Sequence, residues 1–381
     1  MSTRLRTDWK LFTPIMLLLL FGLVMVYSAS SVVAEVLFKR ESWDFAAKQM
    51  VFAIGGLVAM LVIKKIDYSR FQHPMMIFVP ISIIALSLIG VILVDRSAHR
   101  WFSLPGMKIQ PSEFAKPIMI LFLAWFVARR EKKINDRHTL LSAALVIGGI
   151  TALIGFGDLG TAVIILVPAA AVFYVAGIER KYFYLTILLG IALCVYAVVQ
   201  KPYRMLRITS FIGLTEARIH TDPRLEWLAA LTATTRAARD SDHQPHQAKI
   251  ALGSGGVVGV GINQGNQKMG FLPEAHTDFI FGVVGEETGL IGCLLVLAAY
   301  LVIFWRGMRL YWTTPDVFGR YLALGCVTLI TAQALFNMSV VANIAPTKGI
   351  PLPLISYGGS ALLCTLATLG LLLSVSDRAM E

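Results

Sequence analysis

The sequence is poor in charge. Asp, Glu, Lys and Arg make up 15% of its 381 residues, whereas 56% are hydrophobic, and the mean hydropathy is +0.70. An ordinary soluble domain carries about 25% charged residues. The deficit excludes a soluble globular domain and predicts an integral membrane protein.

Cysteine is also scarce. The four cysteines all lie inside apolar stretches and have no paired spacing: Cys194, Cys293, Cys326 and Cys364. This pattern predicts neither an external disulfide nor a zinc site. We expect these residues to pack as small apolar side chains.

Acidic residues are fewer than basic ones, 23 against 34, which leaves a formal net charge of +11. Such an excess can indicate binding to nucleic acid. Many of the cations, however, lie in short loops between apolar stretches, where insertion bias and anionic lipid headgroups account for them. We therefore expect no nucleic acid partner.

Long apolar windows are abundant. Crossing about 30 Å of hydrocarbon at about 1.5 Å per residue requires about 20 residues. Ten candidates lie at roughly 11–30, 49–63, 74–94, 113–128, 140–156, 160–178, 182–199, 279–304, 320–344 and 355–375. The predicted fold is an all-α integral membrane protein in which residues 1–381 form a single polytopic domain. It has ten transmembrane helices and a long extracytoplasmic loop, residues 200–278, between spans 7 and 8.

Basic residues are concentrated in every second loop between the apolar windows. They precede the first window and follow the second, fourth, sixth and eighth, as Lys64, Lys65, Arg129, Arg130, Arg180, Lys181, Arg306 and Arg309 illustrate. The positive-inside rule places these loops and both termini in the cytoplasm. Residues 95–112, Asp158, 200–278 and 345–354 then converge outside. Within them, residues 234–247 have the low hydrophobicity of a flexible linker.

The segment 272–292, "LPEAHTDFIFGVVGEETGLIG", carries acid into an apolar window. A carboxylate at mid-membrane costs about 3 kcal/mol, so Glu286 and Glu287 require compensation. Glycines at spacings of three and four allow close approach of another backbone. The two glutamates either line a functional cavity or join helices through buried hydrogen bonds, and the sequence leaves both open.

Asp278 lies at the outer mouth of this window, beside Thr277 and Glu274. Both Thr277 and Asp278 are suitable N-cap residues, and Pro273 marks a non-helical entry. A cap explains one polar residue but not the cluster Glu274, His276 and Asp278. A helix cap and a functional role for this carboxylate remain equal alternatives.

The segment 343–362, "NIAPTKGIPLPLISYGGSAL", is rich in proline and glycine. Irregular backbone at membrane depth must line a cavity or be buried in protein. Lys348 either snorkels to water or captures an anion on this stiffened loop, and Ser356 follows in the same segment.

A third polar segment, residues 97–117, contains Arg100 and Trp101 before Pro105 and Gly106. Glu113 and Lys116 follow at i, i+3, the spacing of a surface ion pair on one helical face. With Arg204 and Arg207 of "YRMLRITSF", these cations suit an anionic lipid headgroup.

Five motifs resemble the SEDS family (shape, elongation, division and sporulation) of bacterial lipid II polymerases. They are "HRWFSLPGMKIQPSEFAK", "GDLGTAVI", "QAKIALGSGGVVGVG", "LPEAHTDFIFGVVGEETGLIG" and "PTKGIPLPLISYGGSAL", and together they span the chain. Within the family, "PTKGIPLP" and "GEETG" are closer to the cell-division branch (FtsW) than to the elongation branch (RodA).

The resemblance implies a ten-span peptidoglycan glycosyltransferase that polymerises lipid II at the outer face of the bacterial cytoplasmic membrane. It makes Asp278 of "HTDF" the catalytic carboxylate and places Arg100, Glu113, Lys116 and Lys348 around an outer cavity. Asp158 matches the acid of the family's "QPDLGT", although Phe156 and Gly157 replace Gln and Pro. The implied partners are lipid II, a class B penicillin-binding protein transpeptidase, and proteins of the division or elongation complex.

The chemistry fits these residues. Joining sugars while a lipid diphosphate departs needs a base, for which Asp278 is placed, and positive charge near the phosphates, which Arg100 and Lys348 supply. A divalent cation, Mg²⁺ or Mn²⁺, held through Asp278 is a further candidate, and no organic cofactor is expected. The alternatives are a lipid II flippase using Glu286, Glu287 and Lys348, an elongation polymerase of the RodA type, and a non-catalytic scaffold.

Overall fold

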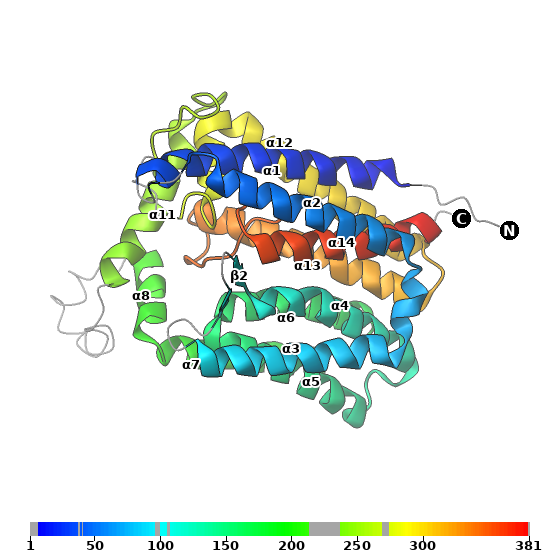
Figure 1. The fold of residues 1–381 in the computed structure, drawn as a ribbon. Helices are drawn as coiled ribbons and strands as arrows, with labels where there is room; N and C mark the ends of the chain where they lie inside the picture. The colour runs from blue at the N-terminus through cyan, green and yellow to red at the C-terminus, as the bar shows by residue number, and fades with distance from the viewer. Residues whose placement is uncertain are drawn as a thin grey trace, which may run out of the picture.

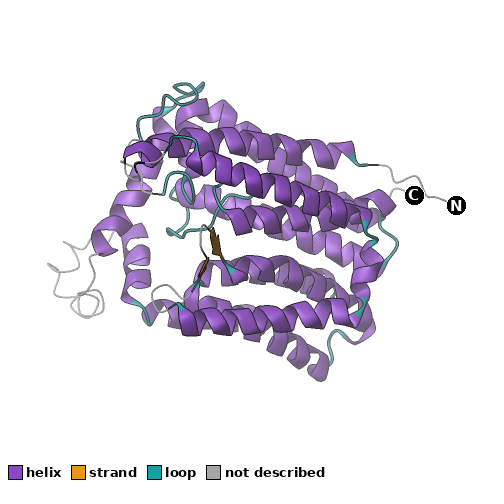
Figure 2. Cartoon of the chain, viewed as in Figure 1, coloured by secondary structure: helices purple, strands orange, loops and turns teal. Residues whose placement is uncertain are grey.

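The computed structural model describes residues 7–36, 39, 41–95, 100–104, 107–212, 237–268 and 274–379. Within this part of the chain, helices form one bundle and two short strands form a hairpin (Figures 1 and 2). The helices of the first half are α1 (Trp9–Val36), α2 (Asp44–Lys65), α3 (Pro74–Val94), α4 (Pro111–Arg130), α5 (Arg137–Gly157), α6 (Leu159–Val175), α7 (Arg180–Val199) and α8 (Pro202–Phe211). The second half contains α11 (Ala237–Ser254), α12 (Ile280–Thr313), α13 (Val317–Val341) and α14 (Gly359–Ala379).

Nine helices in the described residues are long and apolar enough to cross a membrane. They confirm the prediction of an all-α, multi-pass membrane protein. The sixth predicted span corresponds to α6, which has 17 residues and is therefore about 25 Å long. A count of ten spans consequently stays a prediction, because α6 falls short of a full hydrocarbon thickness.

The helix ends follow local chemistry. Asp136, Asp158 and Asp316 lie at the N-caps of α5, α6 and α13, where each side chain accepts backbone N–H groups of the first turn. Proline begins α3 and α4, where its missing N–H has no helical partner to lose. These caps fix where the apolar windows become helical.

The centre of the bundle is formed by α4, α13 and α14, most of whose residues are buried. Helix α13 packs against α4, α6 and α12, and α14 packs against α2. Helix α7 lies at the edge, and none of its own residues is buried. The hydrophobic surface of α7 therefore faces what would be lipid.

The two ends of the bundle differ. Helix α1 begins and α14 ends at one end, whereas β2, α8 and α11 lie at the other (Figure 1). We call the second end, which also holds Asp158, Asp278 and Lys348, the site end. The hairpin there pairs β1 (Phe102–Leu104) with β2 (Met107–Ile109) in antiparallel register, a feature that the sequence analysis did not predict. The turn at Pro105 and Gly106 lies outside the described residues.

The predicted loop 200–278 is partly helical. It contains α8 and α11, so the prediction of a flexible linker over 234–247 is wrong from Ala237 onward. Helix α11 packs against α12 and α8, and its Ala248 and Ala251 are fully buried. The C-terminal part of α11 packs closely against the glycine-rich start of α12, where Ala248 and Ala251 approach Gly282.

Candidate active site

Asp278 lies in the turn that leads into α12, and α13 holds its backbone. The Nδ2 atom of Asn337 donates to the carbonyl oxygens of Asp278 and Ile350, each at 2.7 Å. The same amide therefore joins the Asp278 turn to the irregular segment 342–358. Because Asn337 is buried, water does not compete for these bonds.

Ser356 makes a second link between the same two segments. Its Oγ donates to the carbonyl of Thr277 at 2.6 Å and accepts the N–H of Leu352 at 2.7 Å. The N–H of Tyr357 donates to the carbonyl of His276 at 2.9 Å. The backbone is thus tied on both sides of Asp278, which fixes where its carboxyl points.

The His276 ring is packed between aromatic rings. Its centroid lies 5.0 Å from that of Phe45 and 5.6 Å from that of Tyr357. Burial lowers the pKa of His276 more than the charge of Glu274 raises it. We therefore expect a neutral imidazole that buttresses the turn by packing.

The cap alternative for Asp278 is wrong. The N-cap of α12 is Phe279, without a side-chain cap hydrogen bond, and the helix begins at Ile280. The Asp278 carboxylate instead lies against Gly349, where an added Cβ would be 3.1 Å from its Cγ. Because Gly349 has no side chain, the Asp278 carboxylate can occupy this space.

The surroundings of Asp278 raise the pKa of its carboxyl to about 7. Burial is the main cause, and the negative charges of Glu274 and Asp158 add to it, while Arg207 and Arg100 act in the opposite direction. A carboxyl that titrates near neutrality can accept a proton and release it again. This is the property required of a general base.

Asp158 and Lys348 form an ion pair at the site end. The Lys348 Nζ lies 3.3 Å from Asp158 Oδ1, which also accepts the N–H of Gly160 at 3.0 Å. Burial acts to raise the pKa of Asp158, but Lys348, Arg100 and the hydrogen bond from Thr161 outweigh it and hold the pKa at about 2. Asp158 is therefore a permanent anion that positions Lys348, and the snorkelling alternative is wrong.

Arg100, which precedes β1, contacts the turn between α5 and α6 that contains Asp158. Its Nε donates to the carbonyl of Gly157 at 2.8 Å, and its N–H donates to Asp95 Oδ2 at 3.1 Å. The half-buried Trp101 also donates its N–H to Asp95, at 3.3 Å. Although Phe156 and Gly157 replace the Gln and Pro of the family motif, the turn before Asp158 still binds Arg100 through the carbonyl of Gly157.

The two arginines of α8 have different surroundings. Arg204 is buried, and its guanidinium donates to the carbonyls of Ala197 and Gly155 at 3.0 and 3.2 Å. It ties α8 to the ends of α7 and α5. Arg207 is half-buried, and its charge lowers the pKa of Asp278, so Arg207 is the α8 cation that acts on the site.

Glu113 and Lys116 are buried and not a surface pair. Their side-chain exposures are 3% and 5%, and Nζ lies 2.8 Å from Glu113 Oε1. Lys116 also donates to Gln333 Oε1 at 3.0 Å, and Gln333 Nε2 donates to the carbonyl of Pro351 at 2.8 Å. The pair supports the segment 342–358 through Gln333.

Glu286 and Glu287 are both buried and hydrogen-bonded. Glu286 Oε1 accepts the N–H of Asn266 at 2.7 Å. Glu287 pairs with Lys268 at 2.8 Å and accepts the Ser28 hydroxyl of α1 at 2.6 Å. The hydrogen-bonding alternative therefore accounts for both carboxylates.

Helix α12 is interrupted beside these glutamates. Gly289 has φ 66° and ψ −166°, a conformation that favours glycine. The N–H groups of Val260 and Gly261 donate to the carbonyls of Glu286 and Glu287, each at 3.0 Å, and that of Leu290 donates to Gly256 at 3.0 Å. The segment 255–268 thereby satisfies backbone groups that the break leaves open.

Sequence reasoning missed the amides that hold the site together. Asn337 and Gln333 lie one helical turn apart on α13, and Gln49 of α2 donates to the carbonyl of Ser356 at 3.1 Å. The available signal was an uncharged polar side chain within an apolar window. Such residues usually face the bundle interior and find partners there.

Comparison with known proteins places this arrangement in a family. The model of the "Cell cycle protein" family of FtsW, RodA and SpoVE matches residues 8–381. The "Probable peptidoglycan glycosyltransferase FtsW" of Geobacter metallireducens is 36% identical over 98% of this chain and 95% of its own. The "Stage V sporulation protein E" of Bacillus subtilis is 36% identical over 97% of this chain and 96% of its own.

Solved structures share the fold. A chain from "Structural coordination of polymerization and crosslinking by a peptidoglycan synthase complex" has a TM-score of 0.71 and 24% identity, covering 98% of this chain and 99% of that one. The rod shape determining protein RodA of Thermus thermophilus has a TM-score of 0.66 and 23% identity, covering 99% of each chain. This protein belongs to the cell cycle protein family of FtsW, RodA and SpoVE.

Proposed function

We propose that this protein is a peptidoglycan glycosyltransferase that polymerises lipid II at the site end of the bundle, with Asp278 as the general base. The observation that carries the proposal is the Asp278 carboxylate beside Gly349, on a turn held by Asn337 and Ser356 and near the charges of Arg100 and Arg207. Relatives that match nearly the whole chain and are named peptidoglycan glycosyltransferases support the enzyme class.

The reaction requires one proton transfer. A sugar hydroxyl oxygen forms a bond to the anomeric carbon of the next lipid-linked disaccharide, whose bond to the diphosphate oxygen breaks with its electron pair. The hydroxyl proton goes to Asp278, whose pKa allows it to be ionised before the step and protonated after it. Proton transfer of this kind contributes about 10²–10⁴ to a rate.

The departing diphosphate carries growing negative charge, which nearby cations stabilise. Arg100, Arg207 and Lys348 all act electrostatically on Asp278 or Asp158, so they lie around the same region. Lys348 has three N–H donors and an arginine has five. Ammonium and guanidinium groups of this kind suit the charge of phosphate oxygens.

A divalent cation such as Mg²⁺ or Mn²⁺ would bind jointly with the substrate. Within the described residues no group of three His, Cys, Asp or Glu side chains could hold a metal. Asp278 would contribute one carboxylate, and diphosphate oxygens would supply further hard ligands. The cation would supply additional stabilisation of charge on the leaving group.

Two other functions are less well supported. A flippase would require Glu286, Glu287 and Lys348 as mobile groups near the middle of the membrane. Glu286 and Glu287 are instead bound to the segment 255–268 and to Ser28, and Lys348 pairs with Asp158. A scaffold needs no carboxyl with a raised pKa.

The proposed orientation places the site end outside the cytoplasmic membrane and both termini inside it. The opposite end carries the basic loops, including Lys132 and Arg180, which the positive-inside rule assigns to the cytoplasm. In intact spheroplasts, Gln264→Cys should react with a membrane-impermeant thiol reagent and Lys132→Cys should not. The reverse pattern would overturn the orientation.

A class B penicillin-binding protein is the proposed partner in the division complex. A structurally similar chain comes from a peptidoglycan synthase complex, and several similar relatives are named FtsW. Solubilised membranes should yield this protein together with a transpeptidase of the same cell. Recovery of the chain with an elongation transpeptidase alone would move the role to elongation.

The decisive experiment incubates purified protein with lipid II and resolves the products by length. We expect polymer from the wild type and almost none from Asp278→Asn. Glu274→Gln is the matched control, since it makes the same chemical change on an exposed residue of the same turn. Equal polymer from wild type and Asp278→Asn would refute the role of Asp278.

A further inference from the structure

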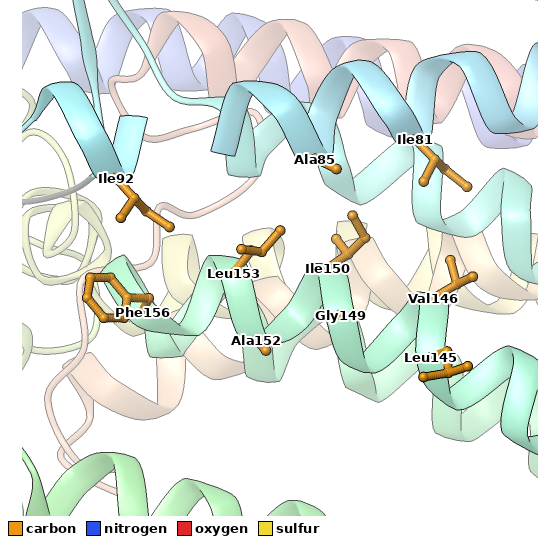
Figure 3. Close-up of a pocket in the computed structure, with 10 residues that line it drawn as sticks. All are labelled: Ile81, Ala85, Ile92, Leu145, Val146, Gly149, Ile150, Ala152, Leu153 and Phe156. Atoms are coloured by element: carbon orange, nitrogen blue, oxygen red, sulfur yellow. The ribbon is translucent and has the colours of Figure 1, made fainter. Parts of the chain in front are cut away.

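An apolar groove of about 570 Å³ runs between α3 and α5. Figure 3 shows its two walls, with Ile81, Ala85 and Ile92 on α3 facing Gly149, Leu153 and Phe156 on α5. Every residue that lines it is apolar. Helices that pack this loosely leave a space that hydrocarbon can fill.

The groove occupies the half of the bundle nearest the site end. Along α3 it extends from Ile81 to Ile92, which corresponds to about 16 Å of helix. One leaflet accounts for half of a hydrocarbon core of about 30 Å. The groove therefore matches the depth of the leaflet on the side of Asp278.

Polar residues lie next to the end of the groove that is nearest the site end. Ile92 and Leu153 also line a small neighbouring pocket whose walls include Arg100 and Asp158. Arg100 and Asp158 in turn act on the charge of Asp278. The apolar groove thus borders the small pocket that contains Arg100 and Asp158 of the candidate active site.

The groove also opens sideways. Phe156 at its upper end is 51% exposed, and Leu145 at its lower end is 67% exposed, so both would contact hydrocarbon in a bilayer. A lipid can then enter from the membrane plane without passing through water. A water-soluble substrate would instead enter from the aqueous phase, through an opening at the site end.

We propose that this groove holds the isoprenoid chain of the lipid-linked substrate, with the diphosphate at Arg100. The proposal rests on the proposed function and assigns the groove to the lipid part of the same substrate. Charge complementarity favours an anionic head, and continuity with the site favours a substrate over bulk phospholipid. A phospholipid in the groove would place its own headgroup where the sugar diphosphate must react.

The groove positions the substrate more than it increases affinity. A chain that moves from lipid into an apolar groove gains no hydrophobic free energy, because lipid tails are as apolar as the groove walls. The gain is in orientation, where an error of 1 Å can cost about 100-fold in rate. Blocking the groove should therefore lower turnover more than it raises KM.

Two adjacent glycines on α5 provide a matched pair of variants. An added Cβ meets no atom within 4 Å at either Gly148 or Gly149, but only Gly149 lines the groove. Gly149→Leu fills the groove, whereas Gly148→Leu adds the same side chain outside it. Both substitutions favour helix over glycine, so loss of the fold does not explain a difference between them.

The binding test uses a polyisoprenyl diphosphate that carries a photoreactive group on its chain, added to the purified full-length protein. We expect cross-links to α3 and α5, roughly tenfold fewer in Gly149→Leu, and wild-type yield in Gly148→Leu. Excess unlabelled polyisoprenyl diphosphate should compete, and phosphatidylglycerol should not. Cross-links confined to other helices, equal yields in both variants or equal competition by phosphatidylglycerol would overturn the proposal.

Lipid II turnover separates this proposal from the proposed function. Gly149→Leu should lose roughly tenfold or more of the turnover with a long isoprenoid chain and little with a shortened chain that does not reach Gly149. Equal loss with both chains would overturn the role of the groove. Specific cross-linking by a wild-type protein that forms no polymer would support the groove and refute the proposed function.

Discussion

Replacing Asp278 by asparagine should make the protein more stable at alkaline pH while it abolishes most of its activity. The substitution keeps the shape of the side chain and removes its charge. Because the backbone of the turn is held by Asn337 and Ser356, the new amide should occupy the place of the carboxylate beside Gly349. The perturbation is therefore confined to ionisation.

The size of the stability effect follows from the pKa. Folding raises the pKa of Asp278 from 3.8 to about 7, and three pH units correspond to about 4 kcal/mol as an upper limit. Between about pH 4 and pH 7 the folded state retains a proton that the unfolded state has lost. Stability therefore falls as pH rises through this window, and the full cost is present above pH 7.

Asp278→Asn removes that cost. We expect its midpoint of thermal unfolding in detergent to match that of the wild type near pH 4 and to exceed it at pH 8. Polymerisation by the wild type should rise about tenfold per pH unit below pH 7 and then level off, whereas the variant should be about 10²–10⁴ slower throughout. Both measurements use the same preparations.

Glu274→Gln is the control for local charge. Glu274 is exposed, and its charge raises the pKa of Asp278, so its removal should shift the pH profile of polymerisation to lower pH without abolishing activity. The reasoning fails if Asp278→Asn is less stable than the wild type at pH 8. It also fails if the activity of the wild type does not change between pH 5 and pH 8.

The remaining predictions concern the groups that hold the site. Gly349→Ala should lower lipid II turnover roughly 100-fold by displacing the Asp278 carboxylate, and a fully active variant would show that the contact is unimportant. Asn337→Leu should cost about 1–3 kcal/mol, seen as a lower unfolding midpoint, because it leaves buried carbonyls unpaired; unchanged stability would contradict this. Lys268→Met should cost about 3–5 kcal/mol by leaving Glu287 as an uncompensated buried charge, and adding Glu287→Leu should restore much of the midpoint. A double variant less stable than the single one would refute the ion-pair argument.

Much of the fold could be predicted from local composition. Long apolar windows become helices in a bilayer because every backbone polar group there must be satisfied within the segment, and this condition needs no knowledge of neighbours. The same reasoning located the polar segments around Arg100, Asp158, Asp278 and Lys348. It failed over 237–247, which continue a helix, α11, whose later residues Ala248 and Ala251 pack against α12.

The roles of the carboxylates were decided by tertiary structure alone. The sequence places Asp278, Glu286 and Glu287 within ten residues of each other and gives each the same chemistry. Glu287 pairs with Lys268 and accepts the hydroxyl of Ser28, 259 residues away, while Asp278 is surrounded by Gly349, Glu274 and distant arginines. The pKa of a carboxyl depends on desolvation and on charges that the fold brings near. The sequence by itself therefore determined that carboxylates occur in and beside an apolar helix. Only the packing of distant segments determined which carboxylates are held by hydrogen bonds and ion pairs and which one can take up a proton.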